Sequence, residues 1–389
     1  MPEASQGGEA EAMTRTRVYQ VGGLLCGVLC VWNYILILKE DTLYQTLTPW
    51  VSHPPWLIYG IRLACVTAVG ILLSAALRSE GRKKHTCFSI FTVLMVVIYA
   101  VIMEAMTYNL SYQMQSLSVS LWPFATYGAA YQTRQWIKNT REKKDLPGGC
   151  GYFLAILMSV WFLETKMVRW GVLGRDPLEI LYLLGMGAVS WKMTETEEKS
   201  QDSGKAMAAI LFMCGLAFLA ALFASDRVGE ILESLKNPIT SVTGNKNGIN
   251  WLGYRKEVFM GAWRGDLSVM EEPYMGKLSR GCPLAWISYA KGPVAMLMVL
   301  ALETGLLYCV VSLAKKQMEG DPWQVLPGIL AAALISRAVL GLAADLFLIT
   351  SSEMGVLLLK NPGDIIAIVY LTAWPLMEKK AMGRPRKGA

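Results

Sequence analysis

Two ionisable residues lie close to the middle of long apolar runs near the end of the chain. Glu303 lies inside Val294–Ala314, and Arg337 lies inside Val325–Thr350. Each run has about 20 residues or more, which is enough to cross a hydrocarbon core roughly 30 Å thick as a helix. A charged side chain at that depth costs about 2.5–3.5 kcal/mol on insertion scales. We therefore expect each one to face protein or water and to have a partner.

The two runs form a predicted hairpin, because only the short polar link Lys315–Trp323 separates them. In an antiparallel hairpin the two midpoints lie at one depth, and a guanidinium binds a carboxylate through two parallel hydrogen bonds. The sequence thus predicts an intramembrane ion pair between Glu303 and Arg337. Asp345 is the competing acid, although it lies about 12 Å further along the helix axis. The site is either a structural clamp between helices or an ion or proton path.

No motif for catalysis or cofactor binding accompanies these residues. The sequence has no phosphate-binding Gly-Lys-Ser/Thr loop, no G-x-S-x-G elbow and no metal-spaced Cys or His pair. Its eight Cys are scattered, mostly inside apolar runs, where Cys behaves as a small hydrophobic residue. We expect a non-enzymatic protein with no catalytic residues, no cofactor and no bound metal.

Membrane helices are the elements that must position these side chains. Apolar residues make up 53% of the chain and charged residues 17%, against about 45–50% and 25% in soluble proteins. The apolar residues gather in runs of about 16–26, separated by links rich in Lys, Arg, Gly and Pro. The sequence therefore predicts an all-α, polytopic transmembrane helical bundle with about 8–10 spans and one long polar loop.

Composition divides the chain into five parts. We expect a disordered N-terminal tail over 1–17, an N-terminal transmembrane bundle over 18–225, a polar loop rich in Gly and aromatic residues over 226–291, a C-terminal transmembrane bundle over 292–377 and a basic tail over 378–389. Gly23 and Gly27 stand four residues apart in the first span, a spacing that lets another helix approach closely.

Two stretches leave alternatives open. Gly151–Leu163 and Leu178–Trp191 are short for full spans, so they form either two tilted spans or a re-entrant or interfacial pair. Further on, Lys360–Asp364 interrupts two apolar segments. That interruption is either the break of a discontinuous helix, which is tolerated where protein or water lines it, or an interfacial turn before a short final span.

Basic residues indicate the orientation of the spans. They cluster after the second span, at Arg78, Arg82, Lys83 and Lys84, and again in the C-terminal tail. Because Lys and Arg concentrate in cytoplasmic loops, we expect both termini to be cytoplasmic. Asn109 begins a glycosylation sequon on the opposite side. Since topology and anionic lipid headgroups explain the net charge of +7, no nucleic-acid partner is expected.

The long polar loop contains residues suited to binding a partner. Its aromatic side chains are interleaved with Gly, and four of them are the candidate partner-binding residues: Trp251, Tyr254, Trp263 and Tyr274. Such a mixture suits an aromatic skirt on lipid headgroups, a clamp for a partner protein, or an ordered loop that caps the bundle. The expected partners are the lipid bilayer and other membrane proteins or further copies of the chain.

Two junctions of paired basic residues and a small residue follow the last span, Lys379-Lys380-Ala381 and Arg386-Lys387-Gly388. With frequent Met and Trp and short spans joined by basic links, they make the last third of the chain resemble the small membrane proteins of flavivirus-like polyproteins. The segment with Asp266-Leu267-Ser268-Val269 and Glu271-Glu272 is similar in layout to that family's protease-cofactor protein. The resemblance implies dibasic processing at Lys379, Lys380, Arg386 and Lys387 and residence in the endoplasmic reticulum or derived membranes.

Two functions remain in competition. The first is a non-enzymatic multi-pass scaffold and partner-binding platform, a viral protein that organises intracellular membranes for replication or assembly. The alternative is an ion- or proton-coupled channel or transporter in which Glu303, Arg337 and Asp345 line a path. A transporter would gather further polar groups on the helix faces of these residues, and Thr304, Ser312 and Ser336 provide only a few.

Overall fold

The protein is an all-α helical bundle, as the sequence predicts. The computed structural model describes residues 3–40, 54–78, 82–107, 117, 119–128, 130, 177–193, 284, 287–288, 291–318, 325–345 and 362–372 of the chain. Every regular element in this part is a helix. Most of the long polar loop, the C-terminal tail and the predicted spans over 151–163 and 206–225 lie outside the described residues.

Apart from the start of α1, the described helices begin and end close to the predicted spans. They are α1 (Glu3–Glu40), α3 (Pro55–Arg78), α4 (Arg82–Thr107), α7 (Pro177–Met193), α14 (Pro293–Gln317), α15 (Val325–Asp345) and the 3-10 turn η5 (Pro362–Asp364), with further helical backbone over 119–128 and 365–372. Three of them, α3, α7 and α14, begin at a proline. Proline is favoured at the first helical position because its missing N–H would find no partner there.

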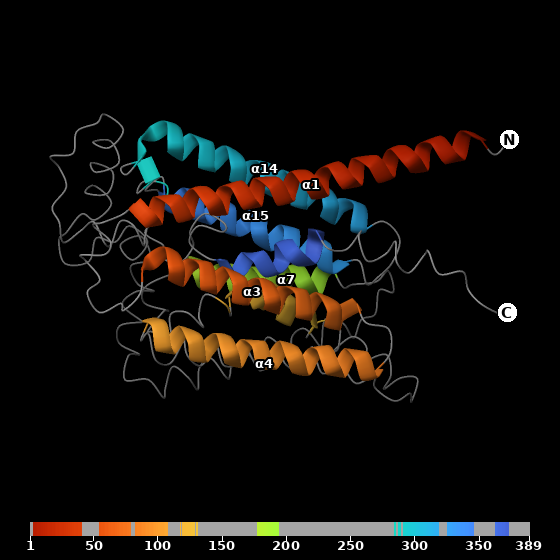
Figure 1. The fold of residues 1–389 in the computed structure, drawn as a ribbon. Coiled ribbons are helices and arrows are strands. Elements are labelled where there is room, and N and C mark those ends of the chain that lie inside the picture. Colours follow the sequence, from red (N-terminus) through yellow and green to blue (C-terminus); the bar gives the residue numbers. More distant parts are fainter. Residues whose placement is uncertain are drawn as a thin grey trace.

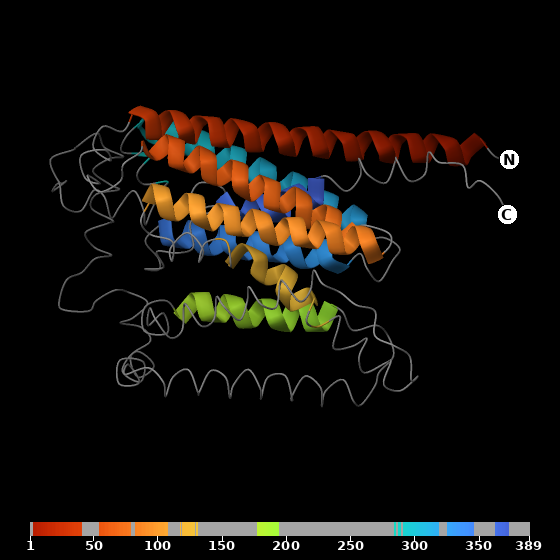
Figure 2. The ribbon, with the colours of Figure 1, turned by 60° about the horizontal axis from the view of Figure 1, so that its bottom comes forward.

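The long helices lie side by side with roughly aligned axes (Figures 1 and 2). Contacts join α1 to α14 and α3, α3 to α4 and η5, and α15 to α14 and α7. The main core lies between these helices and the segments 119–128 and 365–372. The N-terminal part of α1 extends beyond the other helices (Figure 1). With 38 residues α1 is about 57 Å long, whereas a hydrocarbon core is roughly 30 Å thick.

Four of the described helices are long and apolar enough to cross a bilayer. Their spans are Thr14–Leu36, Trp56–Leu77, Pro293–Gln317 and Val325–Leu342. Large apolar side chains on α1, α4 and α14 are exposed on the outside of the bundle, among them Val21, Val101 and Val294. Because an aqueous surface rarely carries so many contiguous apolar side chains, these faces are suited to lipid. The chain is therefore an integral membrane protein.

The N-terminal region differs from the sequence prediction. The tail expected to be disordered is instead helical from Glu3 onward, within α1. Its middle residues include the strong helix formers Glu9, Ala10, Glu11 and Ala12, and a helix already nucleated in the adjoining apolar segment needs no new nucleus to extend. At the other boundary, Leu284 and Ile287, placed by the sequence in the polar loop, are helical and buried.

The small-residue face predicted on the first span is confirmed. A Cβ atom added at Gly23 would lie 3.2 Å from Cys309 Cβ, and one at Gly27 would lie 3.8 Å from Leu306 Cδ1. On the facing helix, a Cβ at Gly305 would lie 3.2 Å from Cys26 Sγ. Because neither helix has side chains in the way, α1 and α14 approach closely along an antiparallel seam.

Candidate functional site

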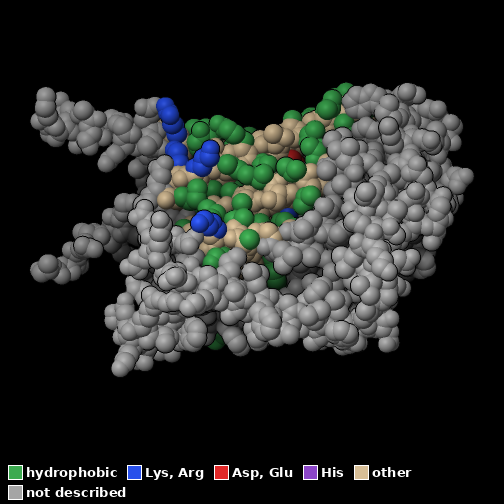
Figure 3. Space-filling view, turned by 180° about the vertical axis from the view of Figure 1, so that it is seen from behind, with side chains coloured by type: hydrophobic (Ala, Val, Ile, Leu, Met, Phe, Trp, Pro, Cys, Tyr) green, Lys and Arg blue, Asp and Glu red, His purple; other side chains and the backbone are tan. Residues whose placement is uncertain are grey.

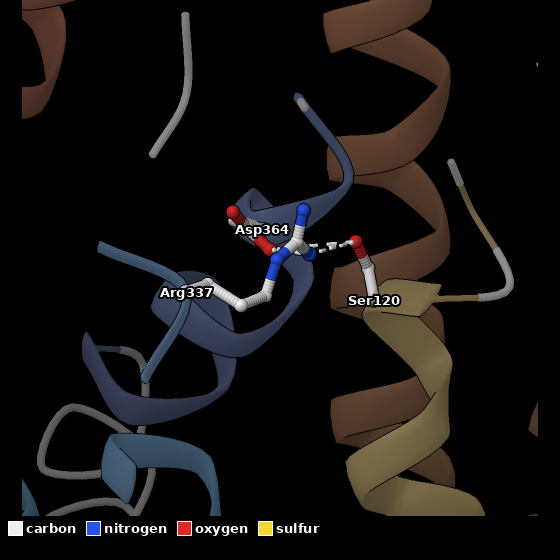
Figure 4. Close-up of polar contacts among 3 residues, drawn as sticks. All are labelled: Ser120, Arg337 and Asp364. Carbon is white, nitrogen blue, oxygen red and sulfur yellow. Dashed lines mark hydrogen bonds and ion pairs between the residues drawn. The ribbon is translucent and has the colours of Figure 1, made fainter. Parts of the chain in front are cut away.

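Arg337 is one of the largest fully buried side chains of the described residues, and it pairs with Asp364. Its Nη1 donates a hydrogen bond to Asp364 Oδ1 at 2.5 Å and to Ser120 Oγ at 3.2 Å (Figure 4). Ser120 Oγ in turn donates to Asp364 Oδ1 at 3.4 Å. All three residues are buried. The cluster therefore closes a triangle of polar contacts inside the bundle.

Three separate parts of the chain position this triangle. Arg337 lies near the middle of α15, Ser120 lies on the helical segment 119–128, and Asp364 ends η5. Asp364 stands directly before the helix over 365–372, where the partial positive charge of a helix N-terminus stabilises a carboxylate. Taking either ion alone out of water costs several kcal/mol, so each one makes the burial of the other tolerable.

The predicted pair between Glu303 and Arg337 is therefore wrong. The polar contacts of Arg337 are with Asp364 and Ser120, whereas Glu303 accepts a hydrogen bond from Cys30 Sγ of α1 at 3.5 Å. Equal depth in a hairpin does not determine the rotation of each helix about its axis. The close approach of α1 at its glycines turns the Glu303 face of α14 toward α1, and Arg337 faces a segment 27 residues further along the chain.

Glu303 lies in a second buried polar cluster. Cys30 and Tyr59 are buried beside it, and Tyr59 interacts electrostatically with Cys30, Glu303 and Arg62. Tyr59 also packs edge to face against Tyr34, with ring centroids 5.0 Å apart. The cluster joins α1, α3 and α14 around one carboxylate. A buried carboxylate of this kind either holds helices together or carries a proton.

The chain has no match in three comparisons with known proteins, namely with protein-family models, with curated protein sequences and with solved structures. The function must therefore be argued from the site itself.

The helix over 365–372 is held at both ends by polar side chains. At its beginning, Asp364 is bonded to Arg337. Near its end, Gln317 Nε2 donates to Leu371 O at 2.7 Å, and Gln20 Nε2 donates to Thr372 O at 2.9 Å. Both glutamines are buried, one on α14 and the other on α1. Asp364 lies beside the middle of α15, so this helix begins inside the bundle. The apolar segment before Lys360–Asp364 lies outside the described residues, so both alternatives for this interruption stay open.

Removing one of these amides gives the first testable prediction. We expect Gln317→Met to lower the free energy of unfolding by about 0.6 kcal/mol, the average measured for side-chain hydrogen bonds between membrane helices, and by no more than about 1.7 kcal/mol. Unfolding in mixed micelles with increasing SDS measures this change. Thr304→Ala is the control, because Thr304 is exposed and bonds only the carbonyl of Leu300 in its own helix. Equal losses in the two variants would contradict the assigned role of Gln317.

The remaining predicted residues are not brought into the site. Asp345 ends α15, but its side chain is outside the described residues, as are Asn109, the four aromatic residues of the loop and the four dibasic residues of the tail.

Sequence reasoning missed Asp364, Ser120 and Cys30. A signal existed for Asp364 alone, since an acid directly before an apolar run is a common helix start. Within the described residues, no group of three or more His, Cys, Asp or Glu is placed to hold a metal.

Proposed function

We propose that the protein is a non-enzymatic multi-pass membrane scaffold. The observation that carries this proposal is the closed Arg337–Asp364–Ser120 triangle. In many transporters the N-terminus of a discontinuous helix points at an anionic substrate near the middle of the membrane. Here the chain's own Asp364 lies at the N-terminus of the helix over 365–372, where a transporter would bind its substrate. The buried ion pair of Arg337 and Asp364 therefore joins this helix to α15. The outward faces of the bundle are left to meet lipid and other membrane proteins.

The resemblance to flavivirus-like membrane proteins supports a narrower version of the proposal. The paired basic junctions at Lys379-Lys380 and Arg386-Lys387 and the layout around Asp266 are the features that carry it. On this basis we propose a viral protein of the endoplasmic reticulum or derived membranes that associates with other membrane proteins or with itself. Both termini are then cytoplasmic, on the same side of the membrane as the links rich in Lys and Arg.

A proton path through Glu303 is the second candidate function. It is favoured by a specific observation, since Glu303 is a buried carboxylate in a span, beside the Cys30 thiol and the Tyr59 ring. The helix over 365–372, which begins inside the bundle, is the other feature that transporters share. Arg337 and Asp364 would then hold that helix in place while Glu303 carries the proton.

Reconstitution into liposomes distinguishes the two functions. With a pH gradient imposed across vesicles that contain a trapped pH dye, a scaffold is expected to leave proton entry at the rate of protein-free vesicles, and Glu303→Gln is expected to change nothing. In parallel, two differently tagged copies are expected to co-purify from mixed membranes. Proton entry well above the protein-free rate that Glu303→Gln abolishes would overturn the scaffold in favour of the path.

A further inference from the structure

Cationic side chains gather at one end of the bundle. Arg15 and Arg17 on α1 lie at the same end as Lys315 and Lys316 on α14, because Lys316 Nζ donates to Thr16 Oγ1 at 2.8 Å across the antiparallel seam. Lys192 in the last turn of α7 is at this end too, since Met193 and Met318 both lie beside Gly328. Figure 3 shows Lys and Arg side chains at one end of a largely apolar face. The positive charge of these Lys and Arg side chains therefore lies at the edge of the apolar face.

At the seam between α1 and α14 one of these cations, Lys316, lies over an aromatic ring. Lys316 Nζ is 5.6 Å from the centre of the Tyr19 ring, and Tyr19 packs edge to face against Tyr308 with centroids 6.0 Å apart. Arg15 precedes Tyr19 by four residues on the same helix face and interacts with it electrostatically. Tyrosine is enriched at the level of lipid headgroups, where one end of its ring is apolar and the other is wet.

Apolar surface continues from this point toward the middle of the membrane. Tyr308 is 63% exposed, and Val18 and Val21 on α1 are 62% and 65% exposed. The corner thus offers two cations, two tyrosine rings and an apolar surface, in the order in which a phospholipid presents its headgroup, its glycerol and its acyl chains. Each Lys or Arg near an anionic membrane surface contributes about 1 kcal/mol of attraction.

From this order we infer that the corner of Arg15, Tyr19, Tyr308 and Lys316 is a binding site for an anionic glycerophospholipid. The headgroup lies against Arg15 and Lys316, and one acyl chain lies along the exposed surface beside Tyr308. The site depends on the placement of the helices in a bilayer and is independent of whether the protein acts as a scaffold or a proton path. It selects for negative headgroup charge, because a zwitterionic lipid with the same chains gains the apolar contact alone.

Binding of two lipids with identical chains tests the site. The full chain, purified in a non-ionic detergent, is titrated with phosphatidylglycerol or with phosphatidylcholine, and bound lipid is counted by native mass spectrometry. We expect phosphatidylglycerol to bind about tenfold more tightly, because two cations contribute about 2 kcal/mol before screening. The preference is expected to shrink toward one at high salt, since surface charges are screened.

Three variants make the test specific. Lys316→Gln is expected to reduce the lipid preference about threefold, Arg15→Gln with Lys316→Gln is expected to abolish it, and Lys316→Arg is expected to keep it. Lys291→Gln is the matched control, because Lys291 is exposed at the opposite end of α14. A salt-insensitive preference, an equal loss in Lys291→Gln, or a loss in Lys316→Arg as large as in Lys316→Gln would overturn the site.

Discussion

Asp364→Asn is expected to lower the free energy of unfolding by about 3–5 kcal/mol, because it leaves the guanidinium of Arg337 buried without a compensating charge. The asparagine has nearly the same shape as the aspartate, so the loss reports the charge rather than a cavity. Unfolding in mixed micelles measures the change, and the yield of folded protein from membranes is expected to fall with it. A loss below about 1 kcal/mol would show that the pair contributes little.

Glu303→Gln is the matched control, since it removes one negative charge from another buried residue of the same bundle. We expect it to destabilise less, because Arg337 keeps its partner. A charge swap tests the pairing directly: Arg337→Asp with Asp364→Arg is expected to recover part of the stability that either single change loses. Recovery by Glu303→Arg with Arg337→Glu, and none by the first swap, would restore the pair that the structure excludes.

Gly70→Leu on α3 is expected to lower the free energy of unfolding by about 1–3 kcal/mol, the usual cost of forcing extra atoms into a packed core. A Cβ at Gly70 would lie only 3.1 Å from Ile366 Cα. That contact is backbone, so it cannot be relieved by a change of rotamer. The helix over 365–372 would have to move away from α3, and the contacts of Asp364 and Gln317 at its two ends would move with it.

The same substitution elsewhere on α3 is expected to have the opposite sign. At Gly60 an added Cβ meets nothing within 4 Å, so Gly60→Leu avoids the backbone clash and is expected to raise the free energy of unfolding by up to about 1 kcal/mol through helix propensity. Parallel SDS titrations of the two variants measure the difference. Equal effects at Gly60 and Gly70 would contradict the close packing of α3 against the helix over 365–372.

The sequence predicts well the spans that lie in the described residues, because the requirement behind them is local. In a bilayer every backbone N–H and C=O must be bonded within its own segment, so an apolar run of sufficient length becomes a helix whatever surrounds it. The window Trp56–Leu77 in α3 coincides with the predicted span, and α14 extends Val294–Ala314 by a few residues. The glycines of α1 also predicted a close approach of another helix, because a face of small residues can be recognised from the spacing of residues within one helix.

The partners of the buried charges could not be predicted from the local sequence. The position of Arg337 within its apolar run predicts its depth in the membrane. Whether it pairs with Asp364 or Glu303 depends on how α14 and α15 are rotated about their axes. That rotation is set by the packing of α1 at Gly23 and of the helix over 365–372 at Gly70, which are far from Arg337 in the chain.

Taken alone, the sequence determines that this is a membrane protein built from helices, that its interior contains a few charges, and that basic residues concentrate in its links and C-terminal tail. Only the tertiary structure decides which charges meet, and that a short helix begins inside the bundle with its ends held by Arg337 and Gln317. The physical reason is range: backbone hydrogen bonding and hydrophobic length act within a segment, whereas an ion pair needs two segments to be rotated toward each other at the same depth.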